Sequence, residues 1–235
     1  MMLGIAAAMG AEMRIITGRR VNIGSVARYS NQLLALSGIG PQRARAAAKL
    51  LLDQGATALL SWGTAAALDS RLEPGSLILP KTIIAADGTL LSVCPEWHER
   101  LYRQLSPGFQ IYTGTMLESP AVLCNANEKR ALFERSGAIA VDMESAALAA
   151  VAHAARVPFM IIRAVADTAD MSVPQRLVHI IQVNGTLRAL HLFAAVALHP
   201  PQWLAIARLA IGFRAAQKKL AAVVKYTGGT FSAFT

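Results

Sequence analysis

The sequence predicts an α/β protein in which a mainly parallel, mixed central sheet is flanked by helices. Continuous apolar segments of strand length alternate with segments of helical pattern, which is typical of a parallel sheet covered on both faces. Apolar residues make up 54% of the 235 residues and charged residues only 16%, so the chain can bury a large core. This length suits one α/β domain.

The first part of the chain is expected to hold four strands, each a short apolar run bounded by turn residues. These strands are Leu3 to Met9, Leu33 to Ser37, Ala58 to Trp62 and Ser76 to Pro80. Pro41 is expected to open a helix that ends near Gln54, because the missing N–H of proline costs nothing at the first helical position. The small residues Gly63 to Ala67 are interpreted as a turn after the third strand.

Two further strands and one helix are expected before residue 170. Ala138 to Val141 is a short strand that leads into a helix from about Glu144 to Ala155. Phe159 to Val165 has the pattern of a buried strand and ends at Asp167.

The segment after Pro200-Pro201 differs in character and predicts a long helix from Trp203 to about Lys225. One face of this helix is apolar and the opposite arc is basic. The apolar face holds Ile206, Leu209, Phe213, Leu220, Val223 and Val224, and the basic arc holds Arg208, Arg214, Lys218, Lys219 and Lys225. We therefore predict a first domain over residues 1–199 and a basic amphipathic helical extension and tail over 200–235.

Positive charge gathers in this same region. The formal net charge is +9, and seven basic residues and no acidic residue follow Asp170. Residues 203–225 can be interpreted as a helix packed on the domain or as a contact with an anionic membrane surface. Nucleic acid is not expected as a partner, because no aromatic interleaving or known binding motif accompanies the charges.

The apolar start of the sequence, its candidate membrane span and its cysteines are all interpreted as those of a cytoplasmic protein. The apolar start is followed at once by Glu12 and has no basic residues before it, so a buried strand is expected there rather than a signal peptide. The longest candidate membrane span, His179 to Leu198, is interrupted by polar residues. Cys94 and Cys124 lack metal-ligand spacing and are expected to be reduced thiols.

Reactive or small residues follow several predicted strands, at the place where ligands bind in parallel α/β sheets. These residues are Glu12, Ser37-Gly38-Ile39-Gly40, Gly63-Thr64, Asp142-Met143-Glu144 and Asp167. A single carboxylate after a strand is usually an ordinary helix cap. Their joint placement predicts a common site.

Four strings of the sequence resemble the signatures of the nucleoside phosphorylase/nucleosidase superfamily, and within it the methylthioadenosine/S-adenosylhomocysteine nucleosidases. They are Gly4-Ile5-Ala6-Ala7-Ala8-Met9-Gly10-Ala11-Glu12, Ser37-Gly38-Ile39-Gly40, Val141-Asp142-Met143-Glu144-Ser145-Ala146 and Arg163-Ala164-Val165-Ala166-Asp167. Their order and spacing also match, over roughly residues 3 to 198. The resemblance implies a three-layer phosphorylase/hydrolase-like fold and cleavage of the bond between a purine and ribose, with release of adenine.

A narrower resemblance is to the hopanoid-associated phosphorylases. It is carried by the helix start Gly38-Ile39-Gly40-Pro41-x-Arg43-Ala44-Arg45, by Val141 to Ser145 and by the basic C-terminal extension. It implies a lipid-linked substrate, adenosylhopane, in hopanoid biosynthesis. A soluble methylthioadenosine/S-adenosylhomocysteine nucleosidase remains an alternative.

The resemblance assigns roles that fit the chemistry. A purine leaves ribose readily only when its N7 is protonated, so a carboxyl group that can hold a proton is needed beside the base. Asp167 is implied as this acid, and Glu144 as the acceptor of hydrogen bonds from the ribose hydroxyls, with Met143 packed on the sugar. Val122 belongs to the segment implied to line the base slot, which holds no aromatic residue.

The remaining implied roles concern the nucleophile. Glu12 matches the carboxylate that positions water in nucleosidases, and Thr64 could hold a water or a phosphate. Arg163 is a third catalytic candidate, expected to order Glu12 and Glu144 or to hold an anion, because a buried arginine needs a partner. Water and inorganic phosphate both remain open as acceptors.

Three positions depart from the family pattern. Ala66 and Ala67 stand where glycines are usual, and Ala166 stands where a serine is usual before the acid. These departures keep a non-catalytic nucleoside-binding protein as a third interpretation. No metal and no organic cofactor are expected, and the expected partners are a nucleoside substrate and further copies of the chain.

Overall fold

The computed structural model describes residues 2–173, 203–229 and 231. In this part of the chain strands and helices alternate, as the sequence predicts. The elements are β1 (Leu3–Ala7), α1 (Gly10–Thr17), β2 (Val26–Tyr29), β3 (Gln32–Leu36), α2 (Pro41–Asp53), β4 (Ala58–Ala67), β5 (Leu77–Ile78), β6 (Thr82–Ile84), β7 (Leu90–Ser92), α3 (Pro95–Leu105), β8 (Ile111–Tyr112), β9 (Thr115–Glu118), α4 (Ala126–Ser136), β10 (Ala140–Asp142), α5 (Ser145–Ala154), β11 (Phe159–Asp167) and α8 (Trp203–Thr227).

The strands form one mixed sheet, which confirms the predicted fold class. The main order is β2-β3-β1-β4-β10-β9-β6-β7, and β11 pairs with both β4 and β5. The central pairs β1–β3, β1–β4 and β4–β11 are parallel, whereas β10 runs antiparallel to β4. Strand β4 is therefore the centre of the sheet and borders three other strands.

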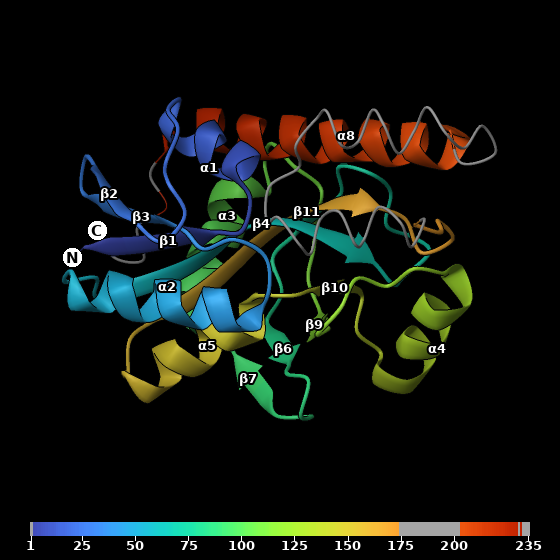
Figure 1. Cartoon of the computed structure of the whole chain (residues 1–235), viewed down its shortest axis with the longest axis horizontal. Coiled ribbons are helices and arrows are strands. Elements are labelled where there is room, and N and C mark those ends of the chain that lie inside the picture. Colours follow the sequence, from blue (N-terminus) through green and yellow to red (C-terminus); the bar gives the residue numbers. More distant parts are fainter. Residues whose placement is uncertain (1, 174–202, 230, 232–235) are drawn as a thin grey trace.

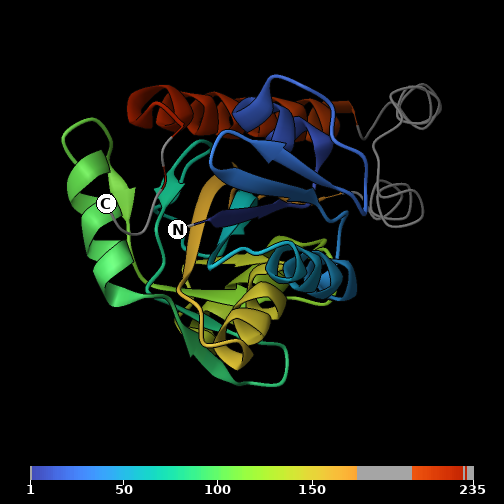
Figure 2. The same cartoon turned by 90° about the vertical axis from the view of Figure 1, so that its left-hand side faces the viewer.

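Helices cover both faces of the sheet, so that the molecule has three layers (Figure 1). Helices α1 and α8 lie on one side, and α2 and α5 lie on the other, as the turned view in Figure 2 also shows. Helix α2 packs against α5, and α8 packs against β11 and α1.

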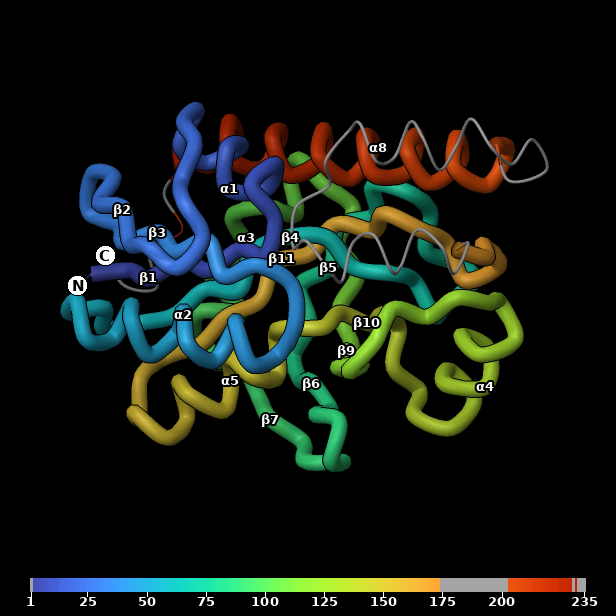
Figure 3. Tube along the Cα trace, in the orientation of Figure 1, coloured from blue at the N-terminus to red at the C-terminus, as the bar shows by residue number. Residues whose placement is uncertain are grey.

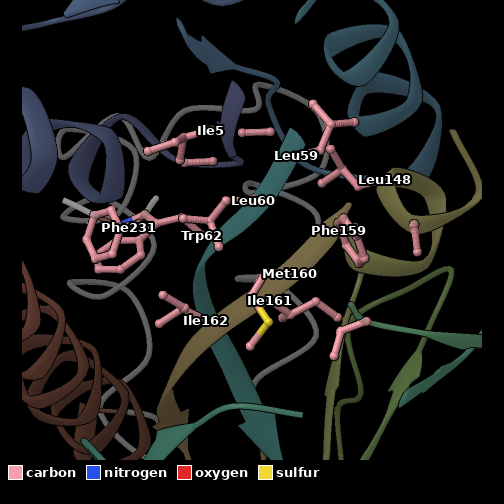
Figure 4. Close-up of a cluster of buried hydrophobic side chains, with 14 of the residues drawn as sticks. Ile5, Leu59, Leu60, Trp62, Leu148, Phe159, Met160, Ile161, Ile162 and Phe231 are labelled. Carbon is pink, nitrogen blue, oxygen red and sulfur yellow. The ribbon is translucent and has the colours of Figure 1, made fainter. Parts of the chain in front are cut away.

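The core is built on the two central strands. Leu59, Leu60 and Trp62 of β4 and Phe159 to Ile162 of β11 are almost fully buried, and Figure 4 shows them beside Ile5 and Phe231. The rings of Trp62 and Phe231 lie 5.1 Å apart between centroids. Residue 231 therefore packs into the same core as β4.

Several element boundaries differ from the predictions. The first strand ends at Ala7, because Met9 takes the capping position before α1. The predicted turn over Gly63 to Ala67 is wrong: β4 continues to Ala67, because β11 and β10 pair with this stretch on either side. The predicted strand Ser76 to Pro80 is reduced to the two residues of β5.

Helix α8 matches the predicted helix of the C-terminal segment, and Leu220 and Val223 of its apolar face are fully buried. Gly212 lies so close to β11 that a Cβ atom there would stand 2.0 Å from the carbonyl oxygen of Ala166. Three apolar residues of α8 that do not belong to this face, Trp203, Leu204 and Ile211, are exposed. No helix of the described residues has the length and apolar character to cross a membrane, and the candidate span His179 to Leu198 lies outside those residues.

Candidate active site

A cavity of about 440 Å³ opens beside the centre of the sheet, where β4, β10 and β11 meet α1 and α8. This volume lies in the range of small-ligand sites. All seven residues that the sequence singles out border it: Glu12, Thr64, Val122, Met143, Glu144, Arg163 and Asp167. Segments far apart in the chain therefore bring the predicted residues to one place.

Glu12 lies in the first turn of α1 and is 2% exposed. Its carboxylate accepts hydrogen bonds from the backbone N–H of Thr64 at 2.8 Å, from the Thr64 hydroxyl at 2.9 Å and from the N–H of Met9 at 3.0 Å. Burial raises the pKa of Glu12 above its usual value, and Arg163 and these donors partly oppose the rise. The carboxyl group is thus fixed in orientation at the floor of the cavity.

The close approach of Glu12 to β4 depends on the absence of a side chain at Gly63. A Cβ atom at Gly63 would lie 2.8 Å from the Glu12 Oε1 atom. The Gly63-Thr64 pair therefore has a different role from the predicted turn: within a strand, it makes room for a carboxylate and supplies two hydrogen bonds to it.

Arg163 is buried on β11 and is paired with Asp142. Its Nε atom donates to Asp142 Oδ2 at 2.9 Å, and its Nη2 atom lies 2.8 Å from the same oxygen in an ion pair. Nη2 donates to the hydroxyls of Ser61 and Ser145. The expectation that buried Arg163 is paired therefore agrees with its contact to Asp142, a residue that the sequence analysis did not name as its partner. Arg163 acts on both glutamates through its charge.

Glu144 precedes α5 and is 8% exposed. Its Oε1 atom accepts a hydrogen bond from the N–H of Gly40 at 2.8 Å, in the glycine turn that the sequence places after the second strand. Burial, and then the nearby charge of Asp142, raise the pKa of Glu144 to about 8. Met143 lies beside Glu144 on the cavity wall.

Asp167 ends β11 and is 9% exposed. Burial raises the pKa of Asp167, while the ammonium of Lys129 opposes the rise from a distance of 2.5 Å. Ala121, Val122 and Leu123 also border the cavity, so aliphatic side chains form part of its wall.

Two residues that contribute to the site were missed at the sequence level. Asp142 is named there only as part of a string, but its carboxylate accepts the Glu144 and Ser145 N–H groups and pairs with Arg163. Lys129 carries no sequence signal, because it lies between the charged residues Glu128 and Arg130 on a helix of polar composition. No group of three His, Cys, Asp or Glu side chains is placed to hold a metal within the described ranges.

Helix α8 supplies the outer wall of the cavity. Its contributions are Ile206, Leu209, Ala210, Phe213, Arg214 and Gln217. The helix that the sequence separates from the first domain thus borders the same cavity as the acid groups.

The layered mixed sheet and its acid-lined cavity define an α/β enzyme with a site for a small organic ligand. The chain belongs to the Phosphorylase superfamily, which matches residues 8–198. It is 26% identical over 200 residues to a 5′-methylthioadenosine/S-adenosylhomocysteine nucleosidase of Buchnera aphidicola, with 72% of this chain and 79% of that protein covered.

Solved structures share the fold at low sequence identity. Futalosine hydrolase of Helicobacter pylori has a TM-score of 0.72 at 16% identity, covering 96% of each chain. The 5′-methylthioadenosine/S-adenosylhomocysteine nucleosidase of Neisseria meningitidis, solved with methylthio-immucillin-A, has a TM-score of 0.72 at 19% identity, covering 97% of this chain and 98% of that chain.

Proposed function

We propose that this enzyme hydrolyses the N-glycosidic bond of an adenosine derivative and releases adenine. The observation that carries the proposal is the meeting of Glu12, Glu144 and Asp167 on one cavity. The named activities of the relatives, nucleosidase and futalosine hydrolase, support the same class of reaction.

Each carboxyl group has one task in this reaction. Asp167 gives its proton to N7 of the purine, so that the electrons of the bond between C1′ and N9 leave with a neutral base. Glu144 accepts hydrogen bonds from the ribose hydroxyls, and Met143 packs on the sugar. Water attacks C1′ and passes its proton to Glu12, which the N–H and hydroxyl of Thr64 hold in place.

Water is a better acceptor than inorganic phosphate in this cavity. A phosphate dianion would have to approach the Glu12 carboxyl group, and like charges at short range repel each other. Arg163, whose charge acts on Glu12, is already paired with Asp142 at 2.8 Å. We propose that Arg163 positions the acid groups rather than binding phosphate.

Substitution Asp167→Asn tests the acid. Asparagine keeps the shape of the side chain but has no proton to give, so we expect adenine release to fall at least about 100-fold. The matched control is Asp87→Asn, an exposed aspartate in the turn between β6 and β7. Full activity of Asp167→Asn, or activity that requires added phosphate in the unchanged enzyme, would contradict the proposal.

The 5′ substituent of the substrate is proposed to be apolar. Ile206, Leu209 and Phe213 of α8 form an apolar wall of the cavity. A lipid-linked adenosine such as adenosylhopane, an intermediate of hopanoid biosynthesis, would place its hydrocarbon there. Methylthioadenosine, whose methylthio group is also apolar, is the second candidate.

An adenine-release assay separates these substrates. Adenosylhopane, methylthioadenosine and S-adenosylhomocysteine are compared at equal concentration, each with and without phosphate. We expect the highest kcat/KM for adenosylhopane and the lowest for S-adenosylhomocysteine, whose charged amino acid group would have to cross the apolar wall. A preference for S-adenosylhomocysteine would overturn the assignment of an apolar substituent and leave the bond cleavage itself untouched.

A further inference from the structure

Lys129 is a fully buried lysine in the second turn of α4. Its ammonium donates to Asp167 Oδ2 at 2.5 Å, to the carbonyl oxygen of Thr168 at 2.7 Å and to that of Met171 at 3.0 Å. An ammonium has three N–H donors, and all three are used here. A buried charge is tolerated only with such partners, so the site is built for the charged form of the lysine.

We propose that Lys129 is a positioning residue for Asp167: it holds one carboxyl oxygen, leaves the other free to face the purine, and stabilises the carboxylate that remains after the proton has left. The inference rests on the proposed function, because it assigns Asp167 the role of acid. Lys129 itself touches no substrate atom in this arrangement.

The geometry supports this role through the segment that follows β11. Figure 3 shows the chain after β11 passing above α4, at the end of the molecule away from the chain start. Lys129 ties this segment to α4 through Thr168 and Met171, and the N–H of Val173 donates to the carbonyl oxygen of Cys124 at 2.9 Å. Cys124 directly follows Ala121, Val122 and Leu123, which line the same cavity as Asp167. These hydrogen bonds therefore fix the position of Asp167 relative to the aliphatic wall of the cavity.

Among the charged groups around Asp167, Lys129 is the one that acts directly on the pKa of its carboxyl group. Asp170 lies three residues after Asp167, and the charge of Arg208 of α8 contributes to lowering the pKa of Asp170. Glu12, Glu144 and Arg214 border the same cavity as Asp167. Only Lys129 forms an ion pair with Asp167 among the described residues. Burial favours the protonated acid before the reaction, and the ammonium lowers the pKa of Asp167 so that the proton can be given up.

The test compares kcat as a function of pH for Lys129→Gln and Lys129→Arg with the unchanged enzyme. Only the protonated acid delivers a proton, so kcat falls as pH rises through the pKa of Asp167. Glutamine removes the cation, and we expect the falling limb to move to higher pH by about one unit or more while the plateau drops about 10-fold or more. Arginine keeps the charge, and its falling limb should stay near that of the unchanged enzyme.

Arg130→Gln is the matched control, because Arg130 is the exposed neighbour of Lys129 on the same helix. It should leave both the limb and the plateau unchanged. An unmoved limb in Lys129→Gln would overturn the inference, since a lysine with a structural role alone would lower kcat equally at all pH values.

The double variant Lys129→Gln, Asp167→Asn gives a second and independent readout. If Lys129 acts through Asp167, the double variant is no slower than Asp167→Asn alone, because residues that act as a unit are not additive. Losses that multiply would overturn the inference even where Lys129→Gln is poorly stable. If Asp167→Asn itself retained full activity, the proposed function would fail instead.

Discussion

Single side chains set the charge balance of the cavity, where three buried carboxyl groups surround one guanidinium. Glu12, Asp142 and Glu144 all interact with the charge of Arg163, and Asp142 alone forms the ion pair. Burial of the two glutamates is therefore only partly compensated by the charge of Arg163, and burial together with the charge of Asp142 raises the pKa of Glu144 to about 8.

This balance predicts a pH-dependent stability that originates at Glu144. The folded state keeps a proton on Glu144 up to about pH 8, whereas the unfolded chain loses it near the ordinary value of 4.5. The free energy of unfolding therefore decreases as pH rises between these values, by at most about 1.4 kcal/mol per unit. We expect Glu144→Gln to flatten the dependence of Tm on pH in this window.

Thermal unfolding at pH 5, 6, 7 and 8 measures this effect. Glu134→Gln, at an exposed position of α4, is the control and should follow the unchanged protein. Parallel curves for Glu144→Gln and the unchanged protein would show that another group causes the dependence.

A second prediction at this scale concerns Gly63. Substitution Gly63→Ala would place a methyl group against the Glu12 carboxylate and push it out of position. We expect kcat to fall about 10- to 100-fold, because displacements of about 1 Å in a catalytic group have effects of this size. Gly10→Ala is the control: it lies in the same helix as Glu12, and its nearest neighbour is a Leu36 methyl carbon 3.9 Å away. An equal fall of kcat in both variants would mean that a shift of the whole helix α1, rather than displacement of the Glu12 carboxylate, causes the loss.

The site was predictable from the sequence as far as it depends on residues that follow strands. Seven residues were predicted, five of them from their place after a strand and Val122 and Arg163 through the family resemblance, and all seven border the cavity. The partner of Arg163 and the presence of Lys129 were not predictable, because both depend on which buried groups lie within 3 Å of each other. A lysine between Glu128 and Arg130 has the pattern of a solvated helix face, and only tertiary packing distinguishes it.

At the scale of elements, long apolar runs were predicted well and short strands were not. Strands β1, β3, β4 and β11 are continuous buried runs, which periodicity detects. Strands β6 to β9, which were not predicted, have two to four residues each, too few to show a period. The small residues of Gly63 to Ala67 have the composition of a turn, and pairing with two neighbouring strands overrides it.

The contact between α8 and β11 gives a prediction for a whole helix. Substitution Gly212→Ala would force α8 away from the Ala166 carbonyl oxygen, next to the proposed acid. We expect a loss of about 1–3 kcal/mol in the free energy of unfolding, as for overpacked interiors, together with lower kcat/KM. Chemical denaturation and the adenine-release assay measure the two effects.

The control for Gly212→Ala is Ala207→Leu, which adds more bulk on the exposed face of the same helix. It should change the free energy of unfolding by no more than about 0.5 kcal/mol. A stable and fully active Gly212→Ala would mean that α8 can shift without affecting the cavity.

At the scale of the whole molecule, exposed apolar residues of α8 lie on the helix that also walls the cavity. Leu204 and Ile211 are 63% and 65% exposed, and the basic Arg208 and Arg214 are exposed beside them. Apolar and basic side chains on one helix favour binding to an anionic lipid surface. We propose this contact for residues 203–225, and a second copy of the chain is the alternative occupant.

Co-sedimentation with vesicles of anionic phospholipid tests the membrane contact. We expect Leu204→Ser, Ile211→Ser to reduce the bound fraction several-fold, whereas Leu90→Ser, at an equally exposed leucine of β7 on the far side of the sheet, has no effect. Unchanged vesicle binding of the double variant, combined with a smaller mass in light scattering, would assign this surface to self-association instead.

The position of α8 also has a consequence for synthesis on the ribosome. Asp167 is made well before residues 206 to 217, which close the outer side of the cavity. A nascent or truncated polypeptide that stops short of this helix would carry the reactive groups without an enclosure for the substrate. Activity should therefore begin only once the helix has been translated and has docked, which couples catalysis to completion of this part of the chain.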